Sequence, residues 1–374
     1  RWWIPVVPAF LAWSGSIIAI NSYTALTAGE IRRTFGRYVS DQVVASLLEN
    51  PENLKLGGEN REITILTSDL RGFTAISEVI SPQEIVEILN IYLSHMSTVI
   101  LSYQGTIDEF MGDGILVLFG APTDQNDAAD RAVACAIAMQ LEMKNVNAIL
   151  SERGFPELEM GIGINTGNVV VGNIGSEQRV KFSAIGNAVN LTYRIESYTI
   201  GGQILISEAT FQEVNHRLQV NGTEVIHPKG VHNPFTIYEI TGINGKYNLS
   251  LPQTQEHFVS LPTSVPVTYV HINDKQMERQ LLDGYVTQLS EKGAQLYIDN
   301  YQELILLEPF SMIKLNVSTA DSLPKSAELK SADIYAKVLD RSVDSSSVYL
   351  HFTHQSPTTK SFFAFLYHQS REAG

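Results

Sequence analysis

Strand-type and helix-type segments alternate along the middle of this chain, and their order restricts the fold more than any other feature. Ile63–Thr67 is a β-branched, apolar run, which is typical of a buried strand. Ser81–Glu84 is a capping box with proline at the first helical position. It predicts a helix that begins there and continues to about Tyr103.

A hairpin, a second helix and another strand follow. Thr106 to Phe119 has the pattern of two short strands on either side of the turn Met111–Gly114. Residues 127–150 are expected to form an amphipathic helix, and Met160–Ile164 another strand. The order β-α-β-β-α-β predicts a ferredoxin-like α+β domain at residues 57–245. That fold supports many functions and does not identify one by itself.

The N-terminal segment has no charged residue from Trp2 to Ala28. An uncharged stretch of this length, with tryptophans at one end, predicts a transmembrane helix at residues 1–28, with a buried helix of a soluble domain as the alternative. Arg32, Arg33 and Arg37 then supply the positive charge expected on the cytoplasmic side. We therefore expect an anchor in the cell inner membrane, a helical signal-transmitting linker at residues 29–56 and a cytoplasmic α+β domain. Because the chain begins with Arg1, we also expect it to be part of a longer protein.

Composition excludes some classes of function. The formal net charge of −14 argues against a protein that binds nucleic acid, which needs a basic surface. Cys135 is the only cysteine, which excludes a disulfide framework and a zinc site built from cysteines.

The C-terminal part differs in composition from the middle of the chain. Residues 246–267 contain several Pro, Thr, Ser and Gln residues and are expected to form a linker. Residues 268–370 are rich in short β-type runs such as Ala294–Ile298 and Ser347–Phe352. These runs predict a small all-β domain, either a barrel or a sandwich.

Two acidic residues occur where strands of the predicted α+β domain end. Asp69 follows the first strand, and Asp113 lies in the hairpin turn. Because these turns meet in a ferredoxin-like sheet, we expect the two carboxylates to hold two Mg²⁺ or Mn²⁺ ions, which would activate a hydroxyl and neutralise phosphates. The backbone N–H groups of Leu70–Ile76 are expected to face phosphate oxygens. Turn aspartates without a ligand are the alternative, and for either residue alone they are the commoner case.

Four motifs give the chain a resemblance to the class III adenylyl and guanylyl cyclases. They are Ser68–Thr74, Gly112–Asp113, Gly161–Gly167 and Ile185–Arg194, in the order and spacing of that family. The resemblance covers about half of the chain and implies an intracellular signalling enzyme that converts a nucleoside triphosphate into a 3′,5′-cyclic nucleotide and pyrophosphate. It also implies a homodimer with two composite sites, since family sites take metal ligands from one catalytic domain and an Asn/Arg pair from the other.

The resemblance assigns roles to particular residues. Asp69 and Asp113 correspond to the metal ligands. Asn190 and Arg194, which the four-residue spacing puts on one helix face, correspond to the groups that orient the ribose and meet the phosphates in the transition state. Lys229 resembles a further phosphate-contacting lysine more loosely, with a solvated surface lysine as the alternative. The remaining expected substrate contacts are Leu70, Arg71, Gly72, Phe73, Thr74, Glu109 and Ser183.

Two of these positions bear on which base is bound. Four residues before Asp113, adenylyl cyclases usually carry lysine, whereas this chain has Glu109. Seven residues before Asn190 they carry aspartate or threonine, whereas this chain has Ser183. A carboxylate accepts hydrogen bonds from N1 and the 2-amino group of guanine, and a hydroxyl donates to O6. We therefore expect GTP as the substrate, with ATP as the alternative because a hydroxyl suits either base.

Tyr193 departs from the family, where small residues are common beside the arginine. A tyrosine there would crowd the site, so a catalytically silent cyclase-like signalling module is a further alternative. The presence of Asp69, Asp113, Asn190 and Arg194 favours an active enzyme.

The flanking parts resemble other bacterial modules. The span from Trp2 to Ile20 resembles the last membrane helix after an extracytoplasmic CHASE2 sensor. Gly284–Gly293 faintly resembles the cyclic-di-GMP-binding PilZ motif, but Gln288 stands where aspartate or asparagine is expected. Lys275 and Arg279 are also poorly spaced for that family's arginine pair. A β domain without a ligand is therefore favoured over a cyclic-di-GMP receptor.

Overall fold

The computed structural model describes residues 56–373 with internal gaps, and seven residues nearer the N-terminus. The gaps are 177, 227–233, 253–255, 274–275, 278–280, 299–306, 308–309, 318–332 and 342–345. The seven are Trp13, Ser14, Ser16, Ile17, Ala19, Ile20 and Tyr23, and all are helical. Most of the predicted membrane span at residues 1–28, and the linker at 29–56 apart from Leu56, lie outside the described residues.

The α+β domain contains fifteen consecutive elements of the described chain. They are β1 (Gly57–Leu70), α3 (Phe73–Val79), α4 (Pro82–Ser102), β2 (Thr106–Met111), β3 (Gly114–Phe119), α5 (Ala128–Glu152), β4 (Met160–Ser176), β5 (Arg179–Ile185), α6 (Asn187–Ser197), β6 (Ile204–Ser207), α7 (Glu208–Val214), the 3-10 turn η2 (Asn215–Arg217), β7 (Leu218–Ile226), β8 (Phe235–Ile243) and β9 (Leu249–Ser250). The expected β-α-β-β-α-β order is confirmed by β1, α4, β2, β3, α5 and β4, with the short helix α3 as an additional element.

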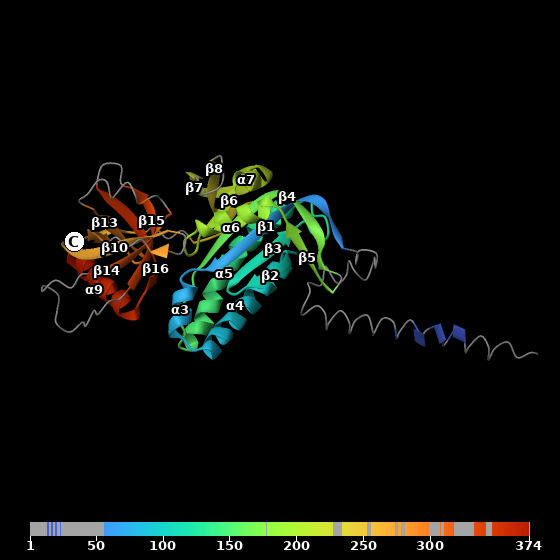
Figure 1. The fold of residues 1–374 in the computed structure, drawn as a ribbon, viewed down its shortest axis with the longest axis horizontal. Coiled ribbons are helices and arrows are strands. Elements are labelled where there is room, and N and C mark those ends of the chain that lie inside the picture. The colour runs from blue at the N-terminus through green and yellow to red at the C-terminus, as the bar shows by residue number, and fades with distance from the viewer. Residues whose placement is uncertain are drawn as a thin grey trace, which may run out of the picture.

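The strands of this domain form one sheet in the order β2-β3-β1-β4-β6-β8-β7, with β5 paired to β4 and β9 paired to β8. The central strand β1 is antiparallel to both β3 and β4, and its residue Asp69 lies opposite Gly161 of β4. Strands β4 and β6 are parallel. Helices α4 and α5 cover one face of the sheet (Figure 1).

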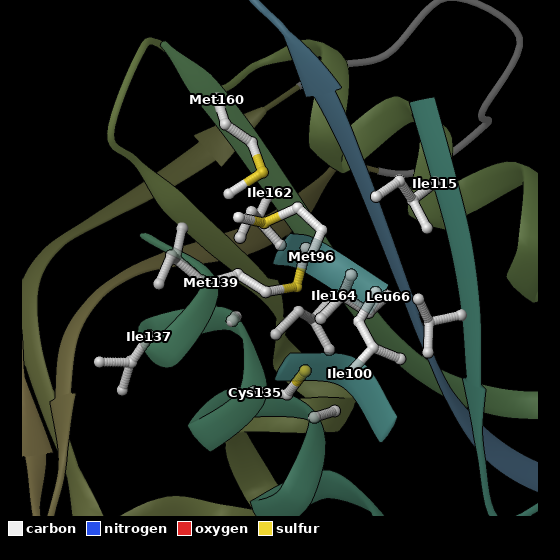
Figure 2. Close-up of a cluster of buried hydrophobic side chains, with 14 of the residues drawn as sticks. Leu66, Met96, Ile100, Ile115, Cys135, Ile137, Met139, Met160, Ile162 and Ile164 are labelled. Atoms are coloured by element: carbon white, nitrogen blue, oxygen red, sulfur yellow. The ribbon is translucent and has the colours of Figure 1, made fainter. Parts of the chain in front are cut away.

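The alternation of side chains along β1 supplies both faces of the sheet with a core. Leu66 points towards α4 and α5, where it joins Met96, Ile100 and Cys135 in the largest buried cluster (Figure 2). Ile63 and Ile65 belong to a second cluster on the opposite face, which includes Val189 of α6. Because a strand places successive side chains on opposite faces, one strand supports helices on both sides.

Helix α4 begins as the sequence predicts. The Ser81 side chain accepts a hydrogen bond from the Glu84 backbone N–H, and the Glu84 side chain accepts one from the Ser81 backbone N–H, so the capping box is complete. Among the described residues, α4 is the one helix long and apolar enough by composition to cross a membrane. Its residues Ile88, Tyr92, Met96 and Ile100 are buried in the core of the α+β domain, so we interpret α4 as a core helix.

The C-terminal domain is a closed barrel. Its elements are β10 (Val259–Asn273), β11 (Gln276–Met277), β12 (Leu282–Leu289), β13 (Gly293–Tyr297), β14 (Met312–Val317), β15 (Asp333–Arg341), β16 (Ser347–Gln355) and α9 (Pro357–Ala373). The strands follow the order β11-β10-β12-β13-β16-β15-β14, and β14 pairs with β10 to close the ring. Phe363 and Tyr367 of α9 pack into the barrel's core.

The structure corrects two expectations about this half of the chain. The linker expected at residues 246–267 is shorter, because β9 and Leu251 still bond to β8 and β10 begins at Val259. The register of β10 shifts between Ser260 and Val265, and this irregularity accommodates a proline-containing segment as a strand. The domain is also not purely β, since α9 closes it after a serine whose side chain caps the Thr359 backbone N–H.

Candidate active site

The two acidic residues singled out in the sequence lie side by side. Asp69 is at the end of β1, and Asp113 is in the turn between β2 and β3. Strand β1 pairs with β3 as far as Ser68. The Leu70 backbone N–H donates a hydrogen bond to Oδ2 of Asp113 over 3.2 Å. Burial, and then the neighbouring Asp113 carboxylate, raise the pKa of Asp69 to about 6, against the opposing effect of Arg71. Two carboxylates held this close favour a bound cation.

This pair has the right chemistry for hard divalent ions but offers few ligands. Carboxylate oxygens are the ligands that Mg²⁺ and Mn²⁺ prefer. Among the described residues there is no group of three or more His, Cys, Asp or Glu side chains that could hold a metal. Asp69 and Asp113 therefore fit ions whose remaining coordination positions are filled by phosphate oxygens and water.

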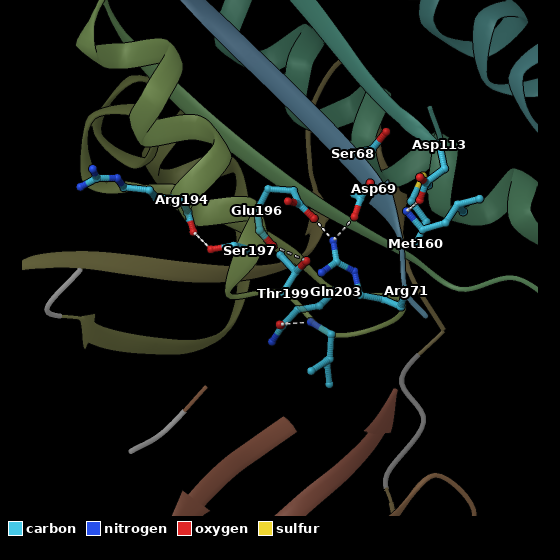
Figure 3. A network of polar contacts seen from close by, with 12 residues as sticks. Ser68, Asp69, Arg71, Asp113, Met160, Arg194, Glu196, Ser197, Thr199 and Gln203 are labelled. Atoms are coloured by element: carbon cyan, nitrogen blue, oxygen red, sulfur yellow. Dashed lines mark hydrogen bonds and ion pairs between the residues drawn. The ribbon is translucent and has the colours of Figure 1, made fainter. Parts of the chain in front are cut away.

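Arg71 connects the end of β1 to α6. Its guanidinium forms an ion pair with Glu196 of α6 and lies 3.6 Å from Oδ2 of Asp69 (Figure 3). Only 13% of its side chain is exposed, so it is positioned inside the protein. The sequence predicts a substrate contact for Arg71 and does not indicate its pairing with Glu196. In this structure the Arg71 side chain links the end of β1, which carries Asp69, to α6.

The other expected phosphate contacts surround a sharp turn. Leu70 and Phe73 are buried and anchor the segment to the core, while Thr74 is exposed. Gly72 has φ of 68°, a left-handed conformation that favours glycine, and it precedes α3. The segment therefore turns sharply at Gly72, three residues after Asp69.

Helix α6 and the residues that follow it pack directly against β4, where two glycines leave room for them. A Cβ atom added to Gly163 would lie 2.4 Å from the backbone nitrogen of Glu196, and one added to Gly161 would lie 1.9 Å from Oγ1 of Thr199. The glycines of the motif Gly161–Gly167 thus fix the height of α6 above the sheet.

Asn190 and Arg194 both lie on α6. Asn190 is exposed and Arg194 is partly exposed. Figure 3 shows the Arg194 guanidinium directed away from the cluster around Asp69 and Arg71. Within one chain, the structure brings the two carboxylates together but does not bring Arg194 to them.

Glu109 and Ser183, the residues expected to select the base, belong to one polar cluster. Lys181 Nζ lies 2.7 Å from Oε2 of Glu109 and 3.2 Å from Oδ2 of Asp108. The Ser183 hydroxyl donates to the same Asp108 oxygen over 3.0 Å. The register of β2 shifts between Ile107 and Glu109, which sets Asp108 apart from its neighbours. Burial raises the pKa of Asp108, although Lys181 and Ser183 oppose it.

Lys181 and Asp108 are not among the predicted site residues. Lys181 lies two positions before Ser183 on β5, so both side chains point to the same face of the strand. This two-residue spacing from Ser183 is the sequence feature that could have identified Lys181. Tyr193 lies near the same cluster and contacts Sδ of Met111 at 3.5 Å, and burial, with Glu109 and Asp108 nearby, raises its pKa to about 12. Lys229 lies outside the described residues, as do Lys275 and Arg279.

Comparison with known proteins identifies the family. Residues 58–242 match the family described as Adenylate and Guanylate cyclase catalytic domain. The guanylyl cyclase Cya2, whose crystal structure is known, is 59% identical to this chain in the matched region. The match includes all of the Cya2 structure and 53% of this chain, with a TM-score of 0.52. The chain therefore belongs to the class III nucleotide cyclase family, and its α+β domain is the cyclase catalytic domain.

Two curated relatives are longer proteins. "Adenylate cyclase 1" of Rhizobium meliloti (strain 1021) is 30% identical over 212 residues, which are 56% of this chain and 32% of that protein. "Adenylate cyclase" of Anabaena cylindrica is 32% identical over 246 residues, or 61% of this chain and 47% of that protein. The chain thus spans less than half the length of these relatives.

Proposed function

We propose that this chain is a guanylyl cyclase, which converts GTP into 3′,5′-cyclic GMP and pyrophosphate. The observation that carries the choice of base is the carboxylate of Glu109, which Lys181 holds at 2.7 Å. Guanine offers donors at N1 and its 2-amino group, and a fixed carboxylate can accept from both. Adenine offers an acceptor at N1, which repels a carboxylate and gives it no donor, so ATP should bind less well than GTP.

The comparisons support either base. The solved structure with 59% identity is that of a guanylyl cyclase, which favours GTP. Both curated relatives are named adenylate cyclases, at 30% and 32% identity. ATP is therefore the alternative substrate, and the Glu109 cluster decides for GTP in our proposal.

Asp69 and Asp113 are the proposed ligands of two Mg²⁺ or Mn²⁺ ions. When bound, such ions supply acidification of the ribose 3′-hydroxyl and neutralisation of the triphosphate. The 3′-oxygen attacks the α-phosphorus in line, the bond to the β-phosphate oxygen breaks, and pyrophosphate leaves while the hydroxyl proton is released. The turn at Gly72 would present backbone N–H groups to phosphate oxygens. Asn190 would orient the ribose, and Arg194 would pair with the phosphates in the transition state.

A homodimer would complete the site. Arg194 points away from the carboxylates of its own chain, so the pair it serves would be the partner's (Figure 3). Exposed apolar side chains lie on β2 and β5, the strands that carry Glu109 and Ser183, and on the neighbouring strand β4. They are Phe110, Met111, Val170, Val180 and Ile185. Such a surface suits a second copy of this domain. Lys229 would add a phosphate contact.

The flanking segments would place and control the enzyme. The uncharged segment 2–28, followed by Arg32, Arg33 and Arg37, supports a membrane anchor with the catalytic domain in the cytoplasm, as after a CHASE2 sensor. We assign no cyclic-di-GMP binding to the PilZ-like C-terminal domain, because Gln288 occupies the position expected for aspartate or asparagine.

The test is turnover of the full chain with GTP and ATP side by side in Mn²⁺. We expect cyclic GMP as the main product and its loss in Asp69→Ala, which shows that the product is the protein's own. Glu109→Gln should lower the preference for GTP over ATP. A preference for ATP in the wild type would overturn the assignment of GTP. No product from either nucleotide in a folded dimer would establish the silent signalling module instead.

A further inference from the structure

The C-terminal barrel contacts the catalytic domain at the end of α6. Lys337 of β15 donates hydrogen bonds to the backbone carbonyls of Ser197, at 2.7 Å, and Thr199, at 2.9 Å. Lys337 is only 2% exposed. Ser197 is the last residue of α6 and Thr199 lies two residues beyond it, at the end of the helix where the dipole concentrates partial negative charge. A lysine from another domain therefore caps this helix.

An aromatic contact strengthens the same junction. The ring of Phe310 packs edge-to-face on Tyr198, the residue that follows α6, with 5.4 Å between ring centroids. Phe310 is held to β15 because its backbone N–H donates to the Val338 carbonyl over 2.7 Å. It joins the cluster of Ile195, Leu205, Ile226 and Ile237 in the catalytic domain. We call Lys337 and Phe310, with the residues they touch at 197–199, the α6 contact.

A second contact reaches the segment that follows Asp69. Glu159 accepts a hydrogen bond from Lys292 Nζ at 2.6 Å, and His351 lies 3.9 Å from its other carboxylate oxygen. The Glu159 backbone carbonyl in turn accepts a hydrogen bond from the Arg71 N–H at 2.7 Å. The Thr353 carbonyl lies so close to Gly72 that an added Cβ would be 2.7 Å away. We call this the Glu159 contact.

Lys337 is a costly residue for this place. Burial, with the Arg71 charge nearby, lowers its pKa well below the usual value for lysine. No carboxylate ion pair of Lys337 occurs among the described residues, so two neutral carbonyls compensate its charge. A methionine would fill a similar volume without burying an ammonium group. We therefore infer that Lys337 matters for the position of α6 and adds little to the overall stability of the protein.

We propose that Lys337 is a positioning residue for the cyclase reaction, through which the C-terminal barrel fixes the end of α6 and hence the placement of Asn190 and Arg194. The inference rests on the proposed function, because that function assigns Asn190 to the ribose and Arg194 to the phosphates in the transition state. The barrel would thus contribute to catalysis by positioning α6. A signal that loosens the barrel would then act on turnover directly.

The test is Lys337→Met in the full chain, with Lys314→Met as the matched control. Lys314 lies on the neighbouring strand β14 and pairs with Asp333 of β15, within the C-terminal domain. Because Arg194 is proposed to act in the transition state, kcat of Lys337→Met should fall about tenfold while KM for GTP changes less than about twofold. Lys314→Met should keep both constants, and both variants should keep the wild-type thermal unfolding midpoint or exceed it.

Hydrogen exchange separates a loosened helix from a general loss of structure. In Lys337→Met the amides of Tyr198 and Thr199, which close the last turn of α6, should exchange faster than in the wild type. Wild-type kcat in a folded Lys337→Met protein would overturn the inference, and so would equal losses in the two lysine variants. If the wild type forms no cyclic nucleotide, the proposed function fails, and faster exchange would then support only the structural contact.

Discussion

At the scale of single residues, the candidate site is dominated by charges placed against one another. Asp69 and Asp113 repel each other, and Arg71 offsets part of that repulsion from 3.6 Å. The sequence could predict that the two carboxylates meet, because each follows a strand of the same sheet. It could not predict the Arg71–Glu196 ion pair, since nothing in the chain's local pattern shows that the end of α6 lies over β1 and β4.

Asp113→Asn should stabilise the protein while it abolishes turnover. The amide removes the like charge beside Asp69 and can still accept the hydrogen bond from the Leu70 N–H. We expect the midpoint of thermal unfolding to rise by about 2–4 °C in EDTA, which corresponds to roughly 1 kcal/mol. Mg²⁺ should stabilise the wild type more than the variant. Asp283→Asn, at an exposed site, serves as control, and an equal rise in both variants would contradict the repulsion.

Lys181→Met should weaken GTP binding with little change in kcat. Lys181 orients Glu109 at a partly exposed position, with 43% of its side chain accessible, so solvent screens the pair. A screened ion pair contributes up to about 1 kcal/mol, which predicts a rise in KM for GTP of up to about fivefold. KM for ATP should rise less. Lys246→Met, which breaks an exposed pair with Asp127, should leave both constants unchanged. A fall in kcat without a change in KM would remove Lys181 from base recognition.

At the scale of elements, the predicted helices and strands were right where the spacing of apolar residues and the capping or turn residues indicated the same element. The capping box at Ser81 placed α4 correctly, and the glycine turn placed the β2–β3 hairpin. The sequence failed where proline and threonine masked a strand in β10, because composition alone cannot show that Pro266 lies opposite Tyr285 of a neighbouring strand. It also missed α9, although Ser356 followed by Pro357 is a typical helix start.

Gly163→Ala tests how closely α6 must approach β4. The added methyl group would lie 2.4 Å from the Glu196 backbone nitrogen, so the helix would have to move away from the sheet. We expect a loss of about 1–3 kcal/mol in the free energy of unfolding. The movement also displaces Arg194, so kcat should fall more than the stability loss explains at a temperature where the variant is folded. Gly222→Ala is the control, since its Cβ meets nothing closer than 3.6 Å. Full activity in Gly163→Ala would show that α6 tolerates displacement.

At the scale of the whole molecule, two domains that sequence patterns treat separately are joined by charged contacts. Lys292, Lys337 and His351 come from three different positions in the barrel, and each touches the catalytic domain. No spacing in the sequence relates them to Glu159 or to α6, because only the docking of the two domains does. The Glu159 contact also responds to pH, because it brings a histidine close to a carboxylate.

His351 and Glu159 set opposite limits to the pH range in which the domains hold together. Burial lowers the pKa of His351, but Glu159 and Glu256 outweigh this effect and raise it above 6.5. Burial raises the pKa of Glu159, but His351 and Lys292 outweigh this effect and lower it to about 2. The contribution of His351 is therefore complete below pH 6.5 and is lost as pH rises through the raised pKa. That of Glu159 is complete above pH 4.5 and is lost as pH falls towards 2.

His351→Gln should thus destabilise the full chain most between about pH 4.5 and 6.5 and progressively less at higher pH. The measurement is the thermal unfolding midpoint of wild type and variant from pH 4.5 to 9, with His368→Gln, an exposed histidine of α9, as control. The control difference should stay flat across this range. A His351→Gln difference that grows with pH would mean that the neutral imidazole makes the stabilising contact. The protonated ring would then have no part in holding the barrel against Glu159.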